Sequence, residues 1–133
     1  IKLAIGSCPQ LTADCLVAMC GKVPRLEMLA ILNNEWVTDD AVVKLLRTTP
    51  RLNFLGVLGT AVTDDTMLAV AEACPGMEKL LVQRCPISDA GLLAVAEGCP
   101  KLKVVNVTGC EQITEEGKRA ANAARPGLFP PDK

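Results

Sequence analysis

The sequence predicts an α/β solenoid, in which short parallel strands line a concave face and helices cover the convex face. Two regular features of the chain predict this fold class. Apolar residues return at the same place in successive segments, and a proline follows at intervals of 25 or 26 residues. A unit of this length cannot bury its own apolar face, so such units are stable only when they stack on one another. The prolines are Pro24, Pro50, Pro75, Pro100 and Pro126.

Each unit opens with two apolar residues separated by one residue, which is the period of a strand with one buried face. A small polar residue or cysteine follows, and we expect it to end the strand and to satisfy the backbone groups of the turn. The first apolar positions are Leu3, Leu29, Leu55, Leu80 and Val105. The second are Ile5, Ile31, Val57, Val82 and Val107. The turn positions are Cys8, Asn34, Thr60, Cys85 and Cys110.

A helix is predicted in the second half of each unit. Hydroxyl residues suited to capping a helix precede acidic residues, which favour the positive end of the helix dipole. An apolar stripe such as Leu92, Val95 and Ala96 then repeats at helical spacing. The proline ends the helix because it cannot donate the next backbone hydrogen bond. The predicted caps are Thr38, Thr63, Ser88 and Thr114.

These motifs resemble the cysteine-containing leucine-rich repeat family, as found in F-box/LRR proteins. The best matches are Leu80-x-Val82-x-x-Cys85-Pro86-Ile87-Ser88-Asp89 and Cys99-Pro100-x-Leu102. The resemblance covers residues 1 to about 126 and implies a horseshoe-shaped solenoid. Family members act as substrate-recognition regions of F-box ubiquitin-ligase subunits and as scaffolding parts of larger assemblies. This chain carries no recognisable F-box, and Asn34 and Thr60 stand where the family has its first cysteine.

The predicted domain organisation is five repeats over residues 1–126, the first of them partial, and a C-terminal tail or cap over residues 127–133. The last predicted helix is polar where the others are apolar, at Lys118, Asn122 and Arg125. Solenoids need such a polar terminal unit, and Phe129 is expected to fold back over it. No cap is recognised at the N-terminal end, so we expect either preceding repeats or a partner that covers that edge.

Residues between the buried strand positions are the ones that a ligand on the concave face would meet. Their alignment predicts an apolar patch beside a polar and basic flank, which we interpret as a surface for a partner protein. The alternative is that another segment of the same chain covers it. The predicted patch consists of Met28, Leu32, Phe54, Leu58 and Leu81, and the flank of Lys79, Gln83, Arg84 and Lys103.

Trp36 occupies a loop position that holds smaller residues in the other repeats. A lone tryptophan at such a position is either an interface anchor or a side chain that lies flat on the neighbouring loop. We include it among the candidate partner-binding residues.

Composition limits the other possibilities. The formal net charge of −1 gives no basic surface for nucleic acid or an anionic membrane, and no apolar stretch is long enough to span a bilayer. Seven cysteines without a C-x-x-C pair argue against a disulfide framework and a zinc ribbon. Free thiols in this number favour a reducing intracellular compartment, with the cytoplasm the first choice.

No metal, cofactor, small-molecule substrate or catalytic activity is predicted. The chain has no His or Tyr and only two serines, Ser7 and Ser88, both at turn positions without a base beside them. Stacking would bring Cys85 near Cys110, within disulfide range, but we interpret both as buried free thiols. The repeated aspartates near the helix starts are explained by helix capping rather than by a cation.

The predicted function is therefore a non-enzymatic protein–protein interaction module that binds its partner on the concave face. Two alternatives remain: a structural or scaffold subunit of a large multiprotein assembly, and the substrate-recognition part of an F-box-type ubiquitin ligase.

Overall fold

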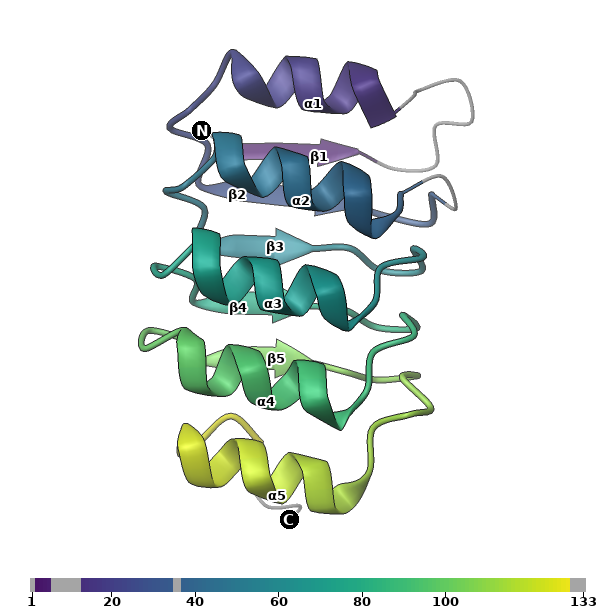
Figure 1. The fold of residues 1–133 in the computed structure, drawn as a ribbon, viewed down its shortest axis with the longest axis vertical. Coiled ribbons are helices and arrows are strands. Elements are labelled where there is room, and N and C mark those ends of the chain that lie inside the picture. The colour runs from purple at the N-terminus through teal and green to yellow at the C-terminus, as the bar shows by residue number, and fades with distance from the viewer. Residues whose placement is uncertain (1, 6–12, 35–36, 130–133) are drawn as a thin grey trace.

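The computed structural model describes residues 2–5, 13–34 and 37–129. Strands and helices alternate along this part of the chain (Figure 1). The elements are β1 (Lys2–Ile5), α1 (Ala13–Gly21), β2 (Met28–Ile31), α2 (Asp39–Thr48), β3 (Phe54–Gly56), α3 (Asp64–Ala73), β4 (Lys79–Leu81), α4 (Asp89–Gly98), β5 (Val104–Asn106) and α5 (Glu115–Ala124).

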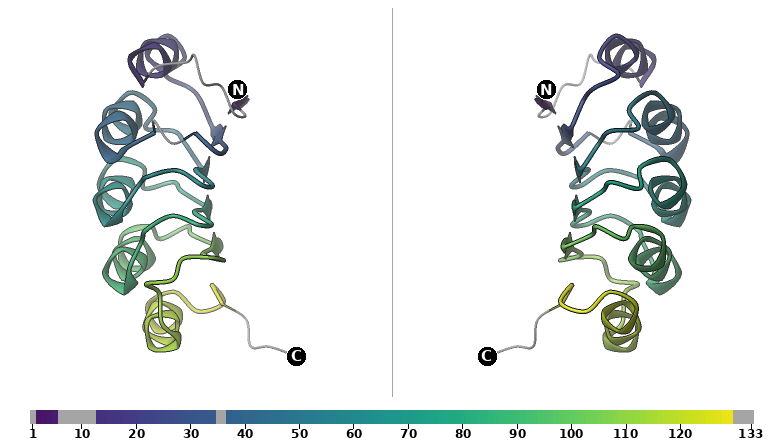
Figure 2. Two further views of the ribbon diagram at one scale, coloured as in Figure 1. Left: turned by 90° about the vertical axis from the view of Figure 1, so that its right-hand side faces the viewer. Right: turned by 90° about the vertical axis from the view of Figure 1, so that its left-hand side faces the viewer.

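The strands form one parallel sheet in the order β1-β2-β3-β4-β5, so each strand pairs with the next one along the chain. Leu29 aligns with Leu55, Leu55 with Leu80, and Leu80 with Val105. This register is the one predicted from the repeat, and the α/β class with its parallel sheet is confirmed. The helices lie together in a second layer on one side of the sheet (Figure 2).

The hydrophobic core lies between the sheet and the helix layer. Leu29, Leu55 and Leu80 are fully buried, as predicted for the inward strand positions. From the helices, Leu92 and Val95 reach the same core. Because the core runs through all units, each unit closes the apolar side of its neighbour, which is why the repeat must continue from layer to layer.

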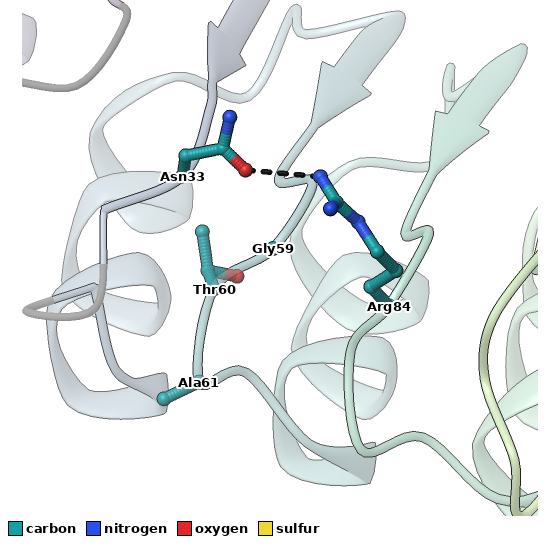
Figure 3. Close-up of a pocket in the computed structure, with 5 residues that line it drawn as sticks. All are labelled: Asn33, Gly59, Thr60, Ala61 and Arg84. Carbon is teal, nitrogen blue, oxygen red and sulfur yellow. Dashed lines mark hydrogen bonds between the residues drawn. The ribbon is translucent and has the colours of Figure 1, made fainter.

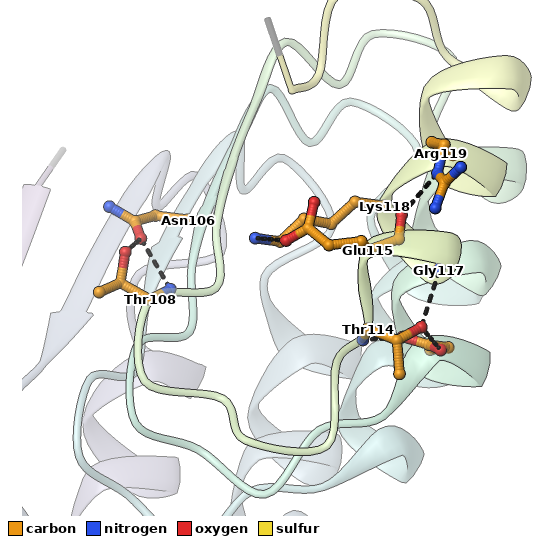
Figure 4. Close-up of polar contacts among 8 residues, drawn as sticks. Asn106, Thr108, Thr114, Glu115, Gly117, Lys118 and Arg119 are labelled. Carbon is orange, nitrogen blue, oxygen red and sulfur yellow. Dashed lines mark hydrogen bonds and ion pairs between the residues drawn. The ribbon is translucent and has the colours of Figure 1, made fainter. Parts of the chain in front are cut away.

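The helix starts follow the predicted positions, but the predicted capping is only partly correct. The side chain of Thr114 accepts a hydrogen bond from the Gly117 N–H at 3.0 Å (Figure 4), and Thr63 accepts a longer one from Asp65. Thr38 and Ser88 occupy the same extended cap position without a side-chain cap hydrogen bond. The Ser88 hydroxyl donates to Asp64 of the preceding unit, as the Thr63 and Thr114 hydroxyls do to Asp39 and Asp89, so this inter-unit bond is common to capped and uncapped helices.

The aspartate that begins α2, α3 and α4 connects its unit to the following one through hydrogen bonds. Asp64 accepts hydrogen bonds from the backbone N–H of Ser88 at 2.8 Å and from its hydroxyl at 2.5 Å. Asp89 accepts the equivalent pair from Thr114 at 2.8 and 2.6 Å. Helix capping alone therefore does not explain the repeated aspartates. They connect successive layers through hydrogen bonds to a charged acceptor, which are stronger than neutral ones.

Two glycines make room for these ties. A Cβ atom at Gly91 would lie 2.3 Å from Oδ1 of Asp64, and one at Gly117 would lie within 2.0 Å of Oδ1 of Asp89. Neither distance is tolerated between non-bonded atoms, so a side chain at either position would displace the carboxylate. In the third unit the equivalent residue is Thr66, whose hydroxyl donates to Asp39 at 2.6 Å.

The chain beyond α5 packs back on the last unit. Leu128 is buried and Phe129 is partly buried against the core. The Asn122 side chain donates to the carbonyl of Phe129 at 2.6 Å and accepts from its N–H at 2.8 Å. The Nε of Arg125 donates to the Ala96 carbonyl at 3.2 Å. Asn122 of α5 and Arg125, which directly follows the helix, thus bind backbone groups in the last two units.

Candidate functional site

The sheet face opposite the helices brings the predicted apolar residues together. Met28 on β2 and Phe54 on β3 are direct register partners. Beyond the strands the backbone ladder continues, because the Asn33 N–H donates to the Leu58 carbonyl at 2.8 Å and the Val57 N–H donates to the Leu81 carbonyl at 2.9 Å. Neighbouring units therefore hold these residues in adjacent rows. All members of the predicted patch are half-buried: Met28, Leu32, Phe54, Leu58 and Leu81.

Gly56 lies at the centre of this patch, although sequence reasoning did not include it. A methyl group placed on Gly56 would lie 3.6 Å from Cδ1 of Leu58, 3.7 Å from Cε1 of Phe54 and 3.6 Å from Cβ of Ala30. The Phe54 ring and the Leu58 side chain therefore come close to each other over a position without a side chain. Gly56 itself is buried, and the half-buried Ala30, Phe54 and Leu58 supply the apolar atoms of the surface around it.

A hollow of about 300 Å³ opens beside this surface, where the strands begin. Met28 and Phe54 supply its apolar part. Lysines and glutamates surround them, and the ammonium group of Lys103 pairs with Glu78 at 3.1 Å. Lys79 is exposed. The hollow thus combines an apolar floor with charged groups that can bind a polar partner. Its complete lining is Lys2, Glu27, Met28, Asn53, Phe54, Glu78, Lys79 and Lys103.

The residues of the predicted polar and basic flank lie in two places. Lys79 and Lys103 lie at the hollow where the strands begin, whereas Arg84 lies in the turn after β4. Its guanidinium donates to Oδ1 of Asn33 at 3.0 Å across Gly59 (Figure 3). These two groups border a second, polar pocket of about 400 Å³. The physical reason is the strand itself, since Lys79 begins β4 and Arg84 follows its end.

The turns that follow β2, β3, β4 and β5 each contain a residue with a positive φ angle. Asn33 and Arg84 have φ values of 54° and 59°, and Gly59 and Gly109 have values of 64° and 80°. Glycine accepts this left-handed region readily, whereas Arg84 does so at a cost. A Cβ at Gly109 would lie 2.8 Å from Cγ of Arg84, so the glycine gives the arginine stem its space.

The remaining predicted residues have different environments. Gln83 is partly buried on the sheet face, and its side-chain Oε1 is buried without a hydrogen-bond partner. Val104, the register partner of Lys79 on β5, is an apolar residue outside the predicted patch and is 40% exposed. Asn106 and Thr108 lie in the last unit, where the Thr108 hydroxyl donates to Oδ1 of Asn106 at 2.7 Å (Figure 4). The apolar patch is therefore followed by polar groups in this unit. Trp36 lies outside the described residues.

The buried cysteines serve the packing between units. The thiols of Cys85 and Cys110 each donate to a carbonyl oxygen of the preceding unit at 3.0 Å. Burial, with a contribution from Cys99, raises the pKa of Cys74 to about 11. Burial likewise raises the pKa of Cys99 to about 11, which Arg125 counteracts in part. Thiols with such pKa values are protonated at neutral pH, so they are poor nucleophiles and poor metal ligands.

The hydrogen bonds between units also lower the pKa values of the Asp39 and Asp89 carboxyl groups. Desolvation raises the pKa of Asp39, but the hydrogen bonds donated by Thr63 and Thr66 outweigh it, so that the pKa lies below its ordinary value. Hydrogen bonds from Thr114 lower the pKa of Asp89. Within the described ranges, no three His, Cys, Asp or Glu residues form a group suited to a metal ion.

The fold is similar to that of the tropomodulin C-terminal domain of Caenorhabditis elegans. The two structures superpose with a TM-score of 0.71 over 95% of this chain and 82% of that domain, at 12% sequence identity. At this identity the similarity shows the fold, which is leucine-rich-repeat-like, and nothing about a partner. No protein-family model and no curated protein matches the sequence. Among the described residues, no helix has the length and apolar character needed to cross a membrane.

Proposed function

We propose that this chain is a non-enzymatic interaction module that binds a partner protein through the strand face. The observation that carries the proposal is that Phe54 and Leu58 both lie within 3.7 Å of the place where a Cβ of Gly56 would be, on the side of the sheet that the helices do not cover. Apolar patches on an otherwise polar surface are typical of contact sites. A repeat fold that presents parallel strands in register supports this use.

The charges at the patch indicate what a partner would present. Apolar side chains would cover Met28 and Phe54, while acidic groups would approach the exposed Lys2 and Lys79. The patch is small beside the roughly 800 Å² per partner of a standard interface. The partner must therefore also contact the rim, including Lys103 and the turn that contains Arg84.

Catalysis is not part of this proposal. The chain has no His or Tyr to act as a base, and the hydroxyl of Ser88 is engaged by Asp64 between two units. The pKa of about 11 of Cys74 and Cys99 excludes these two thiols as neutral-pH nucleophiles. Ser88, Cys74 and Cys99 are therefore poorly suited to act as nucleophiles.

Five more specific expectations from the sequence remain predictions. They are the horseshoe curvature, membership of the cysteine-containing leucine-rich repeat family, the five-repeat domain with its cap, the cytoplasmic location and the ubiquitin-ligase role. An F-box in the same gene product would support the last of these. The scaffold alternative has one observation in its favour, which is that Met19 and Leu68 on the helix layer are 43% and 49% exposed.

The proposal is tested with a double variant on the strand face, Phe54→Asp with Leu58→Asp. Each buried apolar contact contributes about 1.5–3 kcal/mol, so losing two should weaken binding at least about 100-fold. Proteins retained by the wild-type chain are quantified by mass spectrometry and compared with those retained by the variant. Ala90→Asp, which introduces the same charge at an exposed residue of α4, is the control.

We expect the double variant to lose its specific partners while the control keeps them. Both variants should unfold in urea close to the wild-type midpoint, because the substituted side chains lie outside the core. A folded double variant that retains the same proteins in the same amounts would refute the proposal.

A further inference from the structure

The charges of this chain are separated between the two long edges of the stack. Helices lead into the next strand through loops on one edge, and strands lead into the next helix on the other (Figure 1). The first turn of each described helix holds at least one acidic residue, such as Asp64 and Asp65 on α3. The formal net charge of −1 hides this separation, so the sequence-based reasoning from net charge overlooked it.

The loops that lead from a helix into the next strand, taken together with the first residue of that strand, form a basic edge. They hold six cations and two acids, Glu27 and Glu78. All six cations are exposed, and of these only Lys103 forms an ion pair with a described residue, which is Glu78. The cations are Lys22, Arg25, Arg51, Lys79, Lys101 and Lys103.

The helix dipole explains the acids but not these cations. Its effect is confined to the first and last turns of a helix, and the last turns of α1, α3 and α4 hold no basic residue. Arg25, Arg51 and Lys101 lie three or four residues beyond the end of a helix, each directly after the proline of its repeat. No described contact within the chain uses the charge of these three residues, so it is available to a partner.

The basic edge continues into the hollow of about 300 Å³ on the strand face. Lys79 and Lys103 line this hollow together with Met28 and Phe54, which supply its apolar floor. A cavity of about 150 Å³ is large enough for benzene, so the hollow has room for an aliphatic side chain. A single ligand can therefore contact the apolar floor and the cations of the edge at the same time.

We propose that the partner of the strand face is an acidic protein segment that lies along the basic edge and inserts an apolar side chain into the hollow. This inference rests on the proposed function, to which it adds the chemistry of the partner. Neighbouring strands are about 4.8 Å apart, so the four units from β2 to β5 span roughly 14 Å. An extended segment of about five residues crosses this distance, with its carboxylates near Arg25, Arg51 and Lys101.

The acids of this edge favour a protein segment over nucleic acid or an anionic membrane. Glu27 and Glu78 line the hollow, and the last turns of the helices add Arg47 on α2, Glu72 on α3 and Glu97 on α4. A phosphate backbone carries a negative charge at every nucleotide and would meet these carboxylates. A protein segment can instead place its acids at the cations and other residues at the glutamates.

An NMR titration of the full chain with synthetic peptides tests this proposal. The acidic probe is an octapeptide with blocked termini, in which glutamates surround two central leucines. It should bind with a dissociation constant below about 1 mM, shift the signals of Met28 and Lys79, and bind at least about fivefold more weakly when salt rises from about 50 to about 300 mM. The same peptide with lysine in place of glutamate should not bind. Glycine in place of the leucines should weaken binding at least about tenfold.

Gly76 interrupts the row of cations that follow the prolines, and this permits a variant with increased affinity. It stands where other units hold Arg25, Arg51 and Lys101, and a Cβ there would meet no atom within 4 Å. Gly76→Arg should bind the acidic peptide about two- to fivefold more tightly, as expected for one added surface ion pair. Arg51→Glu should weaken binding at least about threefold. Lys44→Glu makes the same change of net charge at an exposed residue of α2, and this matched control should bind like the wild-type chain.

Circular dichroism verifies that each variant is folded. No binding of the acidic peptide, equal binding of the acidic and lysine peptides, or edge variants that bind like the control would overturn this inference. The strand-face module would then still stand, because the double variant on that face tests it separately. An eight-nucleotide oligothymidylate, or vesicles containing phosphatidylserine, that bind more tightly than the acidic peptide would also overturn the inference and assign the edge to a nucleic acid or a membrane.

Discussion

Removing the carboxylate of Asp39 is expected to destabilise the fold strongly. This carboxylate accepts hydrogen bonds from the Thr63 N–H at 2.8 Å, the Thr63 hydroxyl at 2.5 Å and the Thr66 hydroxyl at 2.6 Å. In Asp39→Ala the Thr66 hydroxyl, which is fully buried, loses its acceptor. Hydrogen bonds to charged groups contribute about 1.5–3 kcal/mol each, and a buried donor left unpaired costs about 1–3 kcal/mol.

These contributions are not additive, because Thr63 lies at a partly exposed helix start where water can replace part of the lost bonding. We therefore expect Asp39→Ala to lower the free energy of unfolding by about 3 kcal/mol. Urea titration monitored by circular dichroism measures this value. The control is Asp40→Ala, which removes an exposed carboxylate from the same helical turn and should cost no more than about 1 kcal/mol through the helix dipole.

A double-mutant cycle tests the mechanism itself. In a Thr66→Val background the buried hydroxyl is absent, so Asp39→Ala should cost at least about 1 kcal/mol less than in the wild-type chain. Equal losses for Asp39→Ala and Asp40→Ala, or no coupling with Thr66, would show that the aspartate acts only as a helix-start charge and would refute the proposed connection between units.

Two further predictions concern the same contacts. The folded-state pKa values of Asp39 and Asp89 lie below their unfolded values, so both groups contribute stability above about pH 4 that is lost as the pH falls through the folded values. The urea midpoint should therefore decline below pH 4. A midpoint that stays constant down to pH 2.5 would contradict this prediction. Gly91→Ala should cost about 1–3 kcal/mol, because its new Cβ overlaps the carboxylate of the preceding unit. Gly21→Ala, where no atom lies within 4 Å, should be neutral or stabilise by up to about 1 kcal/mol. Thermal and urea unfolding of the two alanine variants should rank them in this order, and equal stability would show that the glycine space is not needed.

The register of the sheet and the identity of the core could be read from the sequence. A constant spacing of 25 or 26 residues aligns Leu29, Leu55 and Leu80, and the period of two in a strand decides that all three face inward. The same argument places Met28 beside Phe54 on the open face. Both results depend only on repeated backbone geometry, which every unit reproduces.

Side-chain contacts between different units were decided by the tertiary structure alone. The helix-start aspartates looked like local caps in the sequence, yet Asp64 bonds to the next unit, where Ser88 presents its N–H and hydroxyl. Arg84 turns towards Asn33 because Gly59 and its own left-handed backbone leave that direction open. The alignment of the repeats specifies which residue occupies each position. The direction of a long side chain, however, depends on the space and the hydrogen-bonding groups of the neighbouring unit, which are in place only after the units have stacked.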